Sequence, residues 1–308
     1  MALSESYRQQ ARLLLKLLPW VAEEDCFALK GGTAINLFVR DMPRLSVDID
    51  LTYLPVAPRV GSLSAIDSAM KRIGKSIHKA FPRATITNST LKPENAVVKL
   101  LVRNDDAQVK IEVTPVLRGC VFEPEERTVS AQVEAQFGFA EMHVVSFADL
   151  YAGKIVAALD RQHPRDLFDV RDLLANEGID DVLRQAFIVY LLSHNRPMAE
   201  ILDPIRKPLE AEFERGFAGM TDTAVTVGDL AGAREVLIAA IVGEMPEAHR
   251  RFLVSFERGN PEWDLLEVAG AMELPAVRWR QQNLDRLTAD ARKDLVSGLE
   301  AVLYPKRP

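Results

Sequence analysis

The chain has 308 residues, 48% of them hydrophobic and 27% charged, a composition that excludes disordered, fibrous and collagen-like proteins. Lysine and arginine total 38 against 44 aspartate and glutamate, so the formal net charge is −6 and any nucleic acid would have to bind a local basic patch. The isolated Cys26 and Cys120 argue against a disulfide scaffold, and the absence of a long uncharged apolar run or a secretion signal predicts a cytoplasmic protein without a membrane partner.

The first half of the chain alternates between helical and extended patterns. In chain order these patterns predict a helix over 4–24, a short helix over 34–38, a strand over 47–54, a helix over 64–81, and strands over 97–103 and 108–113 that form a hairpin. We interpret 118–138 as a loop or short-strand connector, within which a domain boundary is plausible.

From Ser146 onward the pattern is almost wholly helical. Ser146 is expected to cap the first of these helices by accepting a hydrogen bond from the amide of Asp149. The fold class is therefore α+β, with a mixed-sheet domain over 1–145 and a helical domain over 146–308. The predicted helices cover 149–159, 166–176, 180–193, 227–243, 247–258 and 290–303.

Two acidic residues on the strand over 47–54 are the strongest chemical signal. Asp48 and Asp50 are two residues apart, so both side chains leave the same face while Ile49 points to the core. Two carboxylates held side by side repel each other unless a cation lies between them, and oxygen ligands favour Mg²⁺ or Mn²⁺. Glu112, on the polar face of another alternating strand, is the candidate third ligand. Two acidic residues in this pattern, without further signals, more often mark the solvated face of a strand.

The segment Gly31-Gly32-Thr33 is a second signal, because it precedes a short helix. Glycine lets the backbone approach a phosphate closely, the first amides of the helix can point at that phosphate, and Thr33 adds a hydroxyl donor. Arg44 and Ser46 share the face of Asp48, where they either bind phosphate or orient the carboxylates. The glycine turn alone is more often a tight connection, and Arg44 and Ser46 alone are as readily a plain turn residue and a strand-edge hydroxyl. The order of glycine turn, helix and acidic strand favours a nucleotide and metal site.

A further cluster lies in the helical half. Lys154 is on a helix whose apolar residues pack inward, and we expect its ammonium to be free to reach a nucleotide phosphate. Arg165 and Asp166 open the next helix, and Asp166 shares one face with Asp169. Without the first motif, this pattern favours a helix hairpin with surface ion pairs. Beside a nucleotide site, the same residues supply a cation for the triphosphate and an acid to orient it.

Three segments together resemble the AbiEii/AbiGii toxin family of two-gene toxin–antitoxin and phage-defence systems. They are 29–34, 44–51 and 153–169, so the motifs cover about the first 175 residues. The family belongs to the DNA polymerase β-like nucleotidyltransferase superfamily. The resemblance therefore implies a bilobed protein in which a nucleotidyltransferase domain is followed by a helical domain that completes the active-site cleft.

The resemblance also assigns roles. It implies catalytic roles for Asp48, Asp50, Lys154 and Asp166, metal binding by Asp48 and Asp50, and nucleotide binding by Gly32, Thr33 and Lys154. The arguments from the residues themselves add Glu112 as a catalytic residue and third metal ligand, and they add nucleotide-binding residues, which are Gly31, Arg44, Ser46, Arg165 and Asp169. Glu112 is placed from strand register rather than from a family signature. A phosphate on Ser46 would add about two negative charges beside the metal ligands, and we expect it to block nucleotide binding.

The implied reaction is Mg²⁺- or Mn²⁺-dependent transfer of a nucleoside monophosphate from a nucleoside triphosphate to an acceptor. The acceptor implied first is the 3′ end of tRNA, which would block translation, and the implied protein partner is an antitoxin from a neighbouring gene. Transfer to a protein or a small molecule, and a nucleotide-binding interaction module without turnover, remain open alternatives. A basic stripe formed by Lys71, Arg72, Lys75 and Lys79 favours a solvated helix face over an RNA track.

Overall fold

The computed structural model describes residues 5–305 and divides into two compact units. Of the described residues, unit 1 contains 5–150 together with 218–224, and unit 2 contains 151–217 and 225–305. The first boundary falls inside helix α5 (Phe147–Arg161). A mixed sheet in unit 1 and helices in unit 2 confirm the predicted α+β class.

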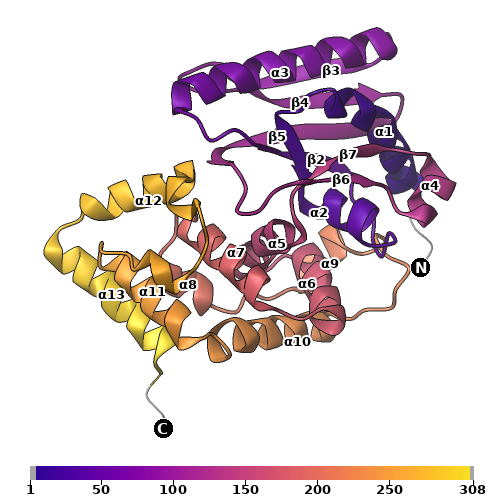
Figure 1. The fold of residues 1–308 in the computed structure, drawn as a ribbon. Coiled ribbons are helices and arrows are strands. Elements are labelled where there is room, and N and C mark those ends of the chain that lie inside the picture. Colours follow the sequence, from indigo (N-terminus) through magenta and orange to yellow (C-terminus); the bar gives the residue numbers. More distant parts are fainter. Residues whose placement is uncertain (1–4, 306–308) are drawn as a thin grey trace. The chain divides into compact units, whose positions relative to one another are not determined.

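Unit 1 is built on a seven-stranded mixed sheet with the order β3-β4-β5-β2-β1-β7-β6 (Figure 1). β2 pairs in parallel with β5 and β1 in parallel with β7, whereas the other neighbours are antiparallel. Through the parallel pairing, the predicted hairpin lies beside the strand that carries Asp48. The strands are β1 Phe27–Lys30, β2 Asp48–Tyr53, β3 Thr85–Leu91, β4 Ala96–Asn104, β5 Ala107–Arg118, β6 Glu125–Thr128 and β7 Glu141–Val144.

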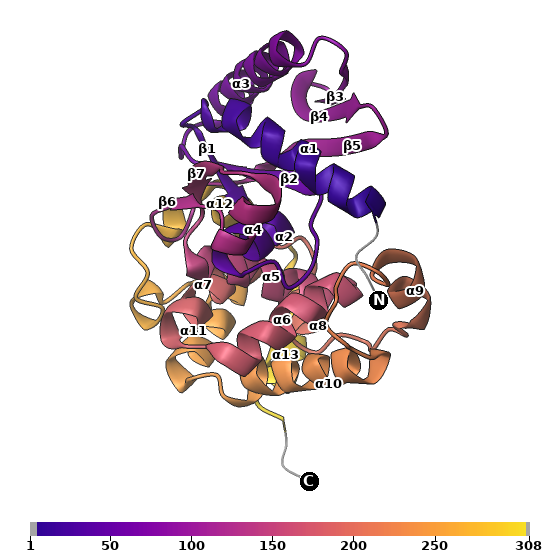
Figure 2. The ribbon, with the colours of Figure 1, turned by 90° about the vertical axis from the view of Figure 1, so that its right-hand side faces the viewer.

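Two long helices cover one face of this sheet. α1 (Glu5–Ala22) buries Leu13, Leu14, Leu17 and Leu18 and crosses in front of β5 and β2 in Figure 2. α3 (Arg59–Ala80) packs on β4 and also contacts α1. Each fully buried leucine contributes about 1.5–3 kcal/mol, so the apolar stripes of the two helices account for their docking. The short helices of unit 1 are α2 Gly31–Thr33, η1 Ala34–Val39 and α4 Ala131–Phe137.

Strand alternation gives the sheet two different faces. Ile49 and Leu51 of β2 and Ile111 of β5 are buried on the helix-covered face. Asp48, Asp50, Lys110 and Glu112 alternate with them and therefore lie on the opposite face, here called the polar face.

Unit 2 packs its helices around aromatic side chains. Phe168 and Phe217 are fully buried with ring centroids 5.3 Å apart, and Phe252 packs against Trp263 at 5.1 Å. Its elements, after α5, are α6 Pro164–Asn176, α7 Asp181–Leu192, α8 Met198–Leu202, α9 Glu210–Gly216, α10 Val227–Ile238, η2 Ala239–Gly243, α11 Glu247–Glu257, η3 Trp263–Leu265, η4 Ala271–Glu273, α12 Pro275–Asp285 and α13 Ala289–Leu303.

The strongly patterned elements were predicted, and weakly patterned ones were missed. Ser146 caps α5 as expected, since the Asp149 amide donates to its hydroxyl at 3.0 Å. The connector over 118–138 instead contains β6 and α4, and β3 was not predicted because its side chains are mostly polar and exposed. Among the described residues, no helix has both the length and the apolar character needed to cross a membrane.

Candidate active site

The sheet register brings the predicted acidic residues of unit 1 together. Asp50 lies opposite Glu112 on β5 and opposite Lys30 on β1, while Asp48 lies opposite Lys110. The parallel pairing of β2 and β5 therefore places the three carboxylates on the polar face of neighbouring strands. This is the arrangement that a third ligand at Glu112 requires.

Lysines neutralise these carboxylates. Lys110 Nζ lies 3.6 Å from Asp48 Oδ2 and 3.1 Å from Glu112 Oε2, and Lys99 Nζ lies 3.0 Å from Glu112 Oε1. Burial alone would raise the pKa of Glu112, but the hydrogen bonds from the two lysines outweigh burial and hold that pKa below its usual value. Glu112 is therefore firmly ionised at neutral pH.

Asp50 is in the opposite situation. Burial raises its pKa, the neighbouring charge of Asp48 raises it further, and the ammonium groups of Lys110 and Lys30 offset only part of this. A half-buried carboxylate whose desolvation is only partly offset by the nearby ammonium groups is destabilised as an anion. It would gain stability from a further cation.

The chemistry of these donors fits a divalent cation. Among residues 5–305, no three acidic, histidine or cysteine side chains converge closely enough to hold an ion as they stand. In this structure the Lys110 ammonium bridges Asp48 and Glu112 and supplies the positive charge between them. Displacing this ammonium would leave Asp48, Asp50 and Glu112 as an all-oxygen donor set suited to Mg²⁺ or Mn²⁺.

The glycine pair lies against the acidic strand. Gly31 has a φ of 74°, and a Cβ on it would lie 2.8 Å from Asp50 Oδ2. A Cβ on Gly32 would lie 2.8 Å from Arg44 Nη2 and 3.0 Å from Ser46 Oγ. Both glycines are needed so that these three side chains can approach the start of α2.

Thr33 is buried and joins α2 to β2. Its hydroxyl donates to the carbonyl oxygen of Asp48, and its Oγ1 lies 3.0 Å from Ser46 Oγ. Asn36 Nδ2 also donates to the carbonyl oxygen of Gly32 at 2.9 Å. The hydroxyl proton of Thr33 thus fixes the turn on the acidic strand in this structure.

Residues 218–224 of unit 1 hold the loop that carries Arg44. The Leu45 amide donates to the carbonyl oxygen of Met220 at 2.8 Å, and Thr221 Oγ1 donates to that of Pro43 at 2.7 Å. Arg44 and Ser46 lie beside Gly32 because this loop is fixed on both sides of Leu45.

Sequence reasoning missed the lysines of this site. Lys30 Nζ donates to Thr114 Oγ1 at 3.1 Å, and burial lowers the pKa of Lys30 although the charges of Asp50 and Glu112 raise it. The signal for Lys110 was present, because a residue two positions before Glu112 on a strand shares its face. The partner of Lys30 follows only from the pairing of β1 with β2, which the sequence pattern does not specify.

In unit 2, the predicted cluster forms a buried ion network. Lys154 Nζ lies 2.8 Å from Asp166 Oδ1 and 2.9 Å from Asp169 Oδ2, and Arg161 Nη2 lies 2.8 Å from Asp166 Oδ2. The expectation that the Lys154 ammonium is free was therefore wrong. A charge that is 7% exposed needs counter-charges, and the two aspartates supply them.

Arg165 differs from these residues. It is half-buried at the start of α6, where its amide donates to His163 Nδ1 at 3.1 Å. Its guanidinium makes no ion pair within residues 5–305, so it is the predicted cation whose charge is not yet compensated.

Comparisons with known proteins agree with this chemistry. A search of curated protein sequences finds no match. The chain is similar in structure to MenT4, a nucleotidyltransferase toxin from Mycobacterium tuberculosis, with a TM-score of 0.59 and 16% identity over 91% of this chain and 94% of the other. At that identity the likeness concerns the fold. The family model described as nucleotidyl transferase AbiEii toxin, type IV toxin–antitoxin system, matches residues 12–280, and the chain therefore belongs to this family of nucleotidyltransferase toxins.

Proposed function

We propose that this nucleotidyltransferase toxin moves a nucleoside monophosphate from a nucleoside triphosphate to the 3′ end of tRNA, in a reaction that depends on Mg²⁺ or Mn²⁺. The acceptor 3′-hydroxyl oxygen forms a bond to the α-phosphorus, the bond from that phosphorus to the β-phosphate oxygen breaks, and pyrophosphate leaves. A tRNA modified in this way would no longer be aminoacylated, and translation would stop.

The observation that carries the proposal is the row formed by Asp50 and Glu112, with Asp48 beside it, next to a helix start that two glycines keep open. Asp48, Asp50 and Glu112 would hold the metal, which when bound would supply positive charge for phosphoryl transfer. Glu112 also accepts the proton of the acceptor hydroxyl. The amides that follow Gly31 and Gly32 bind the outgoing phosphates.

Other residues of the site position these groups. Thr33 and Ser46 keep the start of α2 against the acidic strand, and Arg44 adds a cation beside Gly32. In unit 2, Arg165 neutralises triphosphate charge, and the Lys154, Asp166 and Asp169 network supports the start of α6 from which Arg165 projects.

Incubation of the protein with each labelled nucleoside triphosphate, Mg²⁺ and total tRNA tests the proposal directly. We expect label in tRNA from at least one of the four nucleotides and none with Asp48→Asn. Label found in protein or in a small molecule instead would show that the acceptor is not tRNA. Folded protein that transfers label to none of these acceptors would overturn the proposal.

The family implies an antitoxin partner, and we propose that this partner is encoded beside the toxin gene and that the pair restricts phage. Expression of the chain alone should arrest growth, and co-expression of the neighbouring gene should relieve the arrest. A plaque assay on cells with and without the gene pair measures the phage effect. Equal plaque numbers on both would remove phage defence from the proposal.

A further inference from the structure

The polar face of the sheet continues from the carboxylates to the outer strand. In register, Ser89 of β3 pairs with Lys99 of β4, which pairs with Glu112, and Glu112 pairs with Asp50. Thr87 and Thr85 of β3, and Arg103 of β4, occupy the rows beside it. Because the side-chain period of a strand is two, all of these side chains share the face of Asp50.

The outer part of this face is open and cationic. Thr85, Thr87, Ser89 and Arg103 are exposed, and the Lys99 side chain is 36% exposed. We name these five residues the strand platform. The strand platform carries two cations and three hydroxyl groups, although the net charge of the chain is −6. An exposed turn at Asp105 and Asp106 lies at one end of the platform.

We infer that the strand platform binds the sugar–phosphate backbone of the single-stranded 3′ end of the acceptor RNA and leads it to the carboxylates. This inference rests on the proposed function and names the surface that its acceptor uses. β3 and β2 are three strand spacings apart, about 14 Å. A single-stranded RNA end that crosses the platform therefore reaches Asp50 within a few nucleotides.

The chemistry of the platform specifies how it binds. Cations and hydroxyl groups bind phosphate and sugar oxygens, whereas the platform has no aromatic side chain on which a base could stack. Its contacts therefore position an RNA end without selecting its sequence. Lys99 links the platform to the carboxylates, because its ammonium pairs with Glu112 in this structure. A metal bound to Glu112 would release this ammonium to bind a phosphate.

A competing surface lies on the helix-covered face. A groove of about 520 Å³ runs between α3 and β3, with Lys75, His78 and Lys79 on its helix side and Asn88 on its strand side. An RNA backbone in this groove would have the sheet between itself and Asp50. The groove therefore carries no path to the carboxylates within unit 1.

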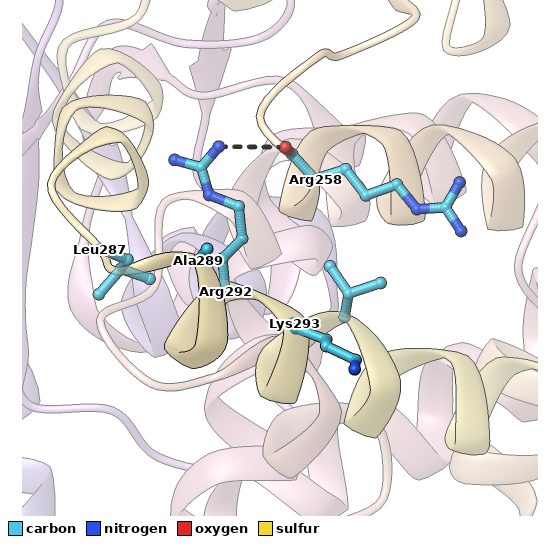
Figure 3. Close-up of a pocket in the computed structure, with 6 residues that line it drawn as sticks. Arg258, Leu287, Ala289, Arg292 and Lys293 are labelled. Carbon is cyan, nitrogen blue, oxygen red and sulfur yellow. Dashed lines mark hydrogen bonds between the residues drawn. The ribbon is translucent and has the colours of Figure 1, made fainter.

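A second basic pocket lies in unit 2, between Arg258 and the start of α13 (Figure 3). There, Arg292 donates to the carbonyl oxygens of Arg258 and Leu284, and Arg258 pairs with Glu300 at 2.6 Å. Its guanidinium groups hold the fold together. Little of their charge remains for a phosphate.

Neighbouring residues on β3 give a matched pair of variants. Ser89→Asp adds a carboxylate to the platform, whereas Asn88→Asp adds the same charge one residue away on the opposite face, in the groove. Both side chains are exposed, so both variants should fold. Arg103→Glu is a third variant, because Arg103 contacts only the Gln108 side chain, at 2.8 Å, among the polar groups of the described residues.

The probe is fluorescently labelled total tRNA, titrated at several salt concentrations without nucleotide. We expect Ser89→Asp and Arg103→Glu to weaken binding roughly tenfold at low salt, and Arg103→Glu to lower the slope of log affinity against log salt by about 0.7. Asn88→Asp should change affinity less than twofold. Equal losses in Asn88→Asp and Ser89→Asp, or a loss only in Asn88→Asp, would overturn the platform in favour of the groove.

A second readout separates this inference from the proposed function. Binding of nucleoside triphosphate, measured as a shift in the unfolding midpoint, should be the same in all three variants and in the parent protein. If the parent transfers label to tRNA but Ser89→Asp and Arg103→Glu keep the parental KM for tRNA, the platform is wrong and the function stands. If label enters another acceptor, the proposed function fails whatever the variants do.

Discussion

At the residue scale, Gly31 is a position of the candidate site where backbone conformation and side-chain space both disfavour any larger residue. We expect Gly31→Ala to cost about 1–2 kcal/mol from the left-handed backbone alone, and more because its Cβ would meet Asp50 Oδ2 at 2.8 Å. Denaturant unfolding measures the stability, and label transfer measures the displacement of Asp50.

Gly178 provides the control for this prediction. Its φ is 72°, close to the 74° of Gly31, and a Cβ there meets nothing within 4 Å. Gly178→Ala should therefore show the backbone cost without any loss of transfer. If the two variants are equally active, contact between Gly31 and Asp50 is unimportant.

The negative charge on Asp50 destabilises the folded protein, whereas the proposed reaction needs this carboxylate. Removal of the charge should therefore raise stability and lower activity. The folded pKa of Asp50 is raised, which means that the native state binds the proton more tightly and stability falls as pH rises above 3.8 through that folded pKa. Asp50→Asn should therefore raise the thermal unfolding midpoint at pH 7 while transfer falls roughly a thousandfold. An unchanged or lower midpoint would show that Lys30 needs the carboxylate more than burial disfavours it.

Lys110 pairs with Asp48 and Glu112, so we expect it to compete with a metal at the proposed site. Lys110→Met should raise the affinity for Mn²⁺ by roughly tenfold or more, an effect of the size that neighbouring groups exert on metal sites. Calorimetric titration with Mn²⁺ in the absence of nucleotide measures this. Lys16→Met, on the exposed side of α1, is the control for loss of a lysine charge, and equal affinities in the two variants would contradict the competition.

At the scale of elements, the ion network between α5 and α6 should contribute to stability. Lys154→Met leaves two carboxylates, 4% and 1% exposed, without their shared ammonium, and we expect a cost of about 3–5 kcal/mol. Arg161→Ala should cost far less, because that side chain is 62% exposed. Chemical denaturation of both variants checks the contrast, and activity lost by Lys154→Met counts as catalytic only where the protein is folded.

The elements that could be predicted are those with one strong period. α1 and α3 carry apolar stripes, β2 and β5 alternate strictly, and Ser146 has its cap three residues before Asp149. β3 was missed because an exposed edge strand does not need alternating apolar residues in its sequence. Its many hydroxyl side chains are instead typical of a loop.

The site was predictable to the same extent. The positions of Asp48 and Asp50 follow from strand alternation within one element, and Glu112 needed only the assumption that β5 adjoins β2. The burial of Lys154 and its aspartate partners could not be predicted, because helix periodicity does not reveal which charged face of a helix another helix covers. Lys30 and Lys99 required the order of the strands, which local patterns do not contain.

At the scale of the whole molecule, the two units contain groups that respond to pH in opposite directions. Asp50 in unit 1 favours lower pH, as argued above. Burial lowers the pKa of His163, His194 and His249, all in unit 2, so the unfolded chain binds more protons below 6.5 and stability is lost as pH falls through the folded pKa values. Unit 2 should therefore be the part that these groups make sensitive to acid.

His249→Gln tests this expectation. His249 is buried, its Nδ1 has no hydrogen-bond partner in the described chain, and the charge of Arg184 adds to the effect of burial. We expect the loss of stability between pH 7.5 and pH 5.5 to be smaller in the variant. Fluorescence of Trp263, which packs on Phe252, follows the unfolding. Parallel pH profiles for variant and parent would assign the acid sensitivity elsewhere.

The return of residues 218–224 to unit 1 means that this unit is not encoded as one continuous stretch of the gene. A fragment that stops at residue 150 would contain every strand together with Asp48, Asp50 and Glu112, yet it would lack the Met220 carbonyl and the Thr221 hydroxyl that fix the loop around Leu45. Truncation cannot therefore yield a complete nucleotidyltransferase domain. A split version of the toxin would have to supply this seven-residue segment in trans, which makes the segment a natural place to assemble the toxin from two inactive halves.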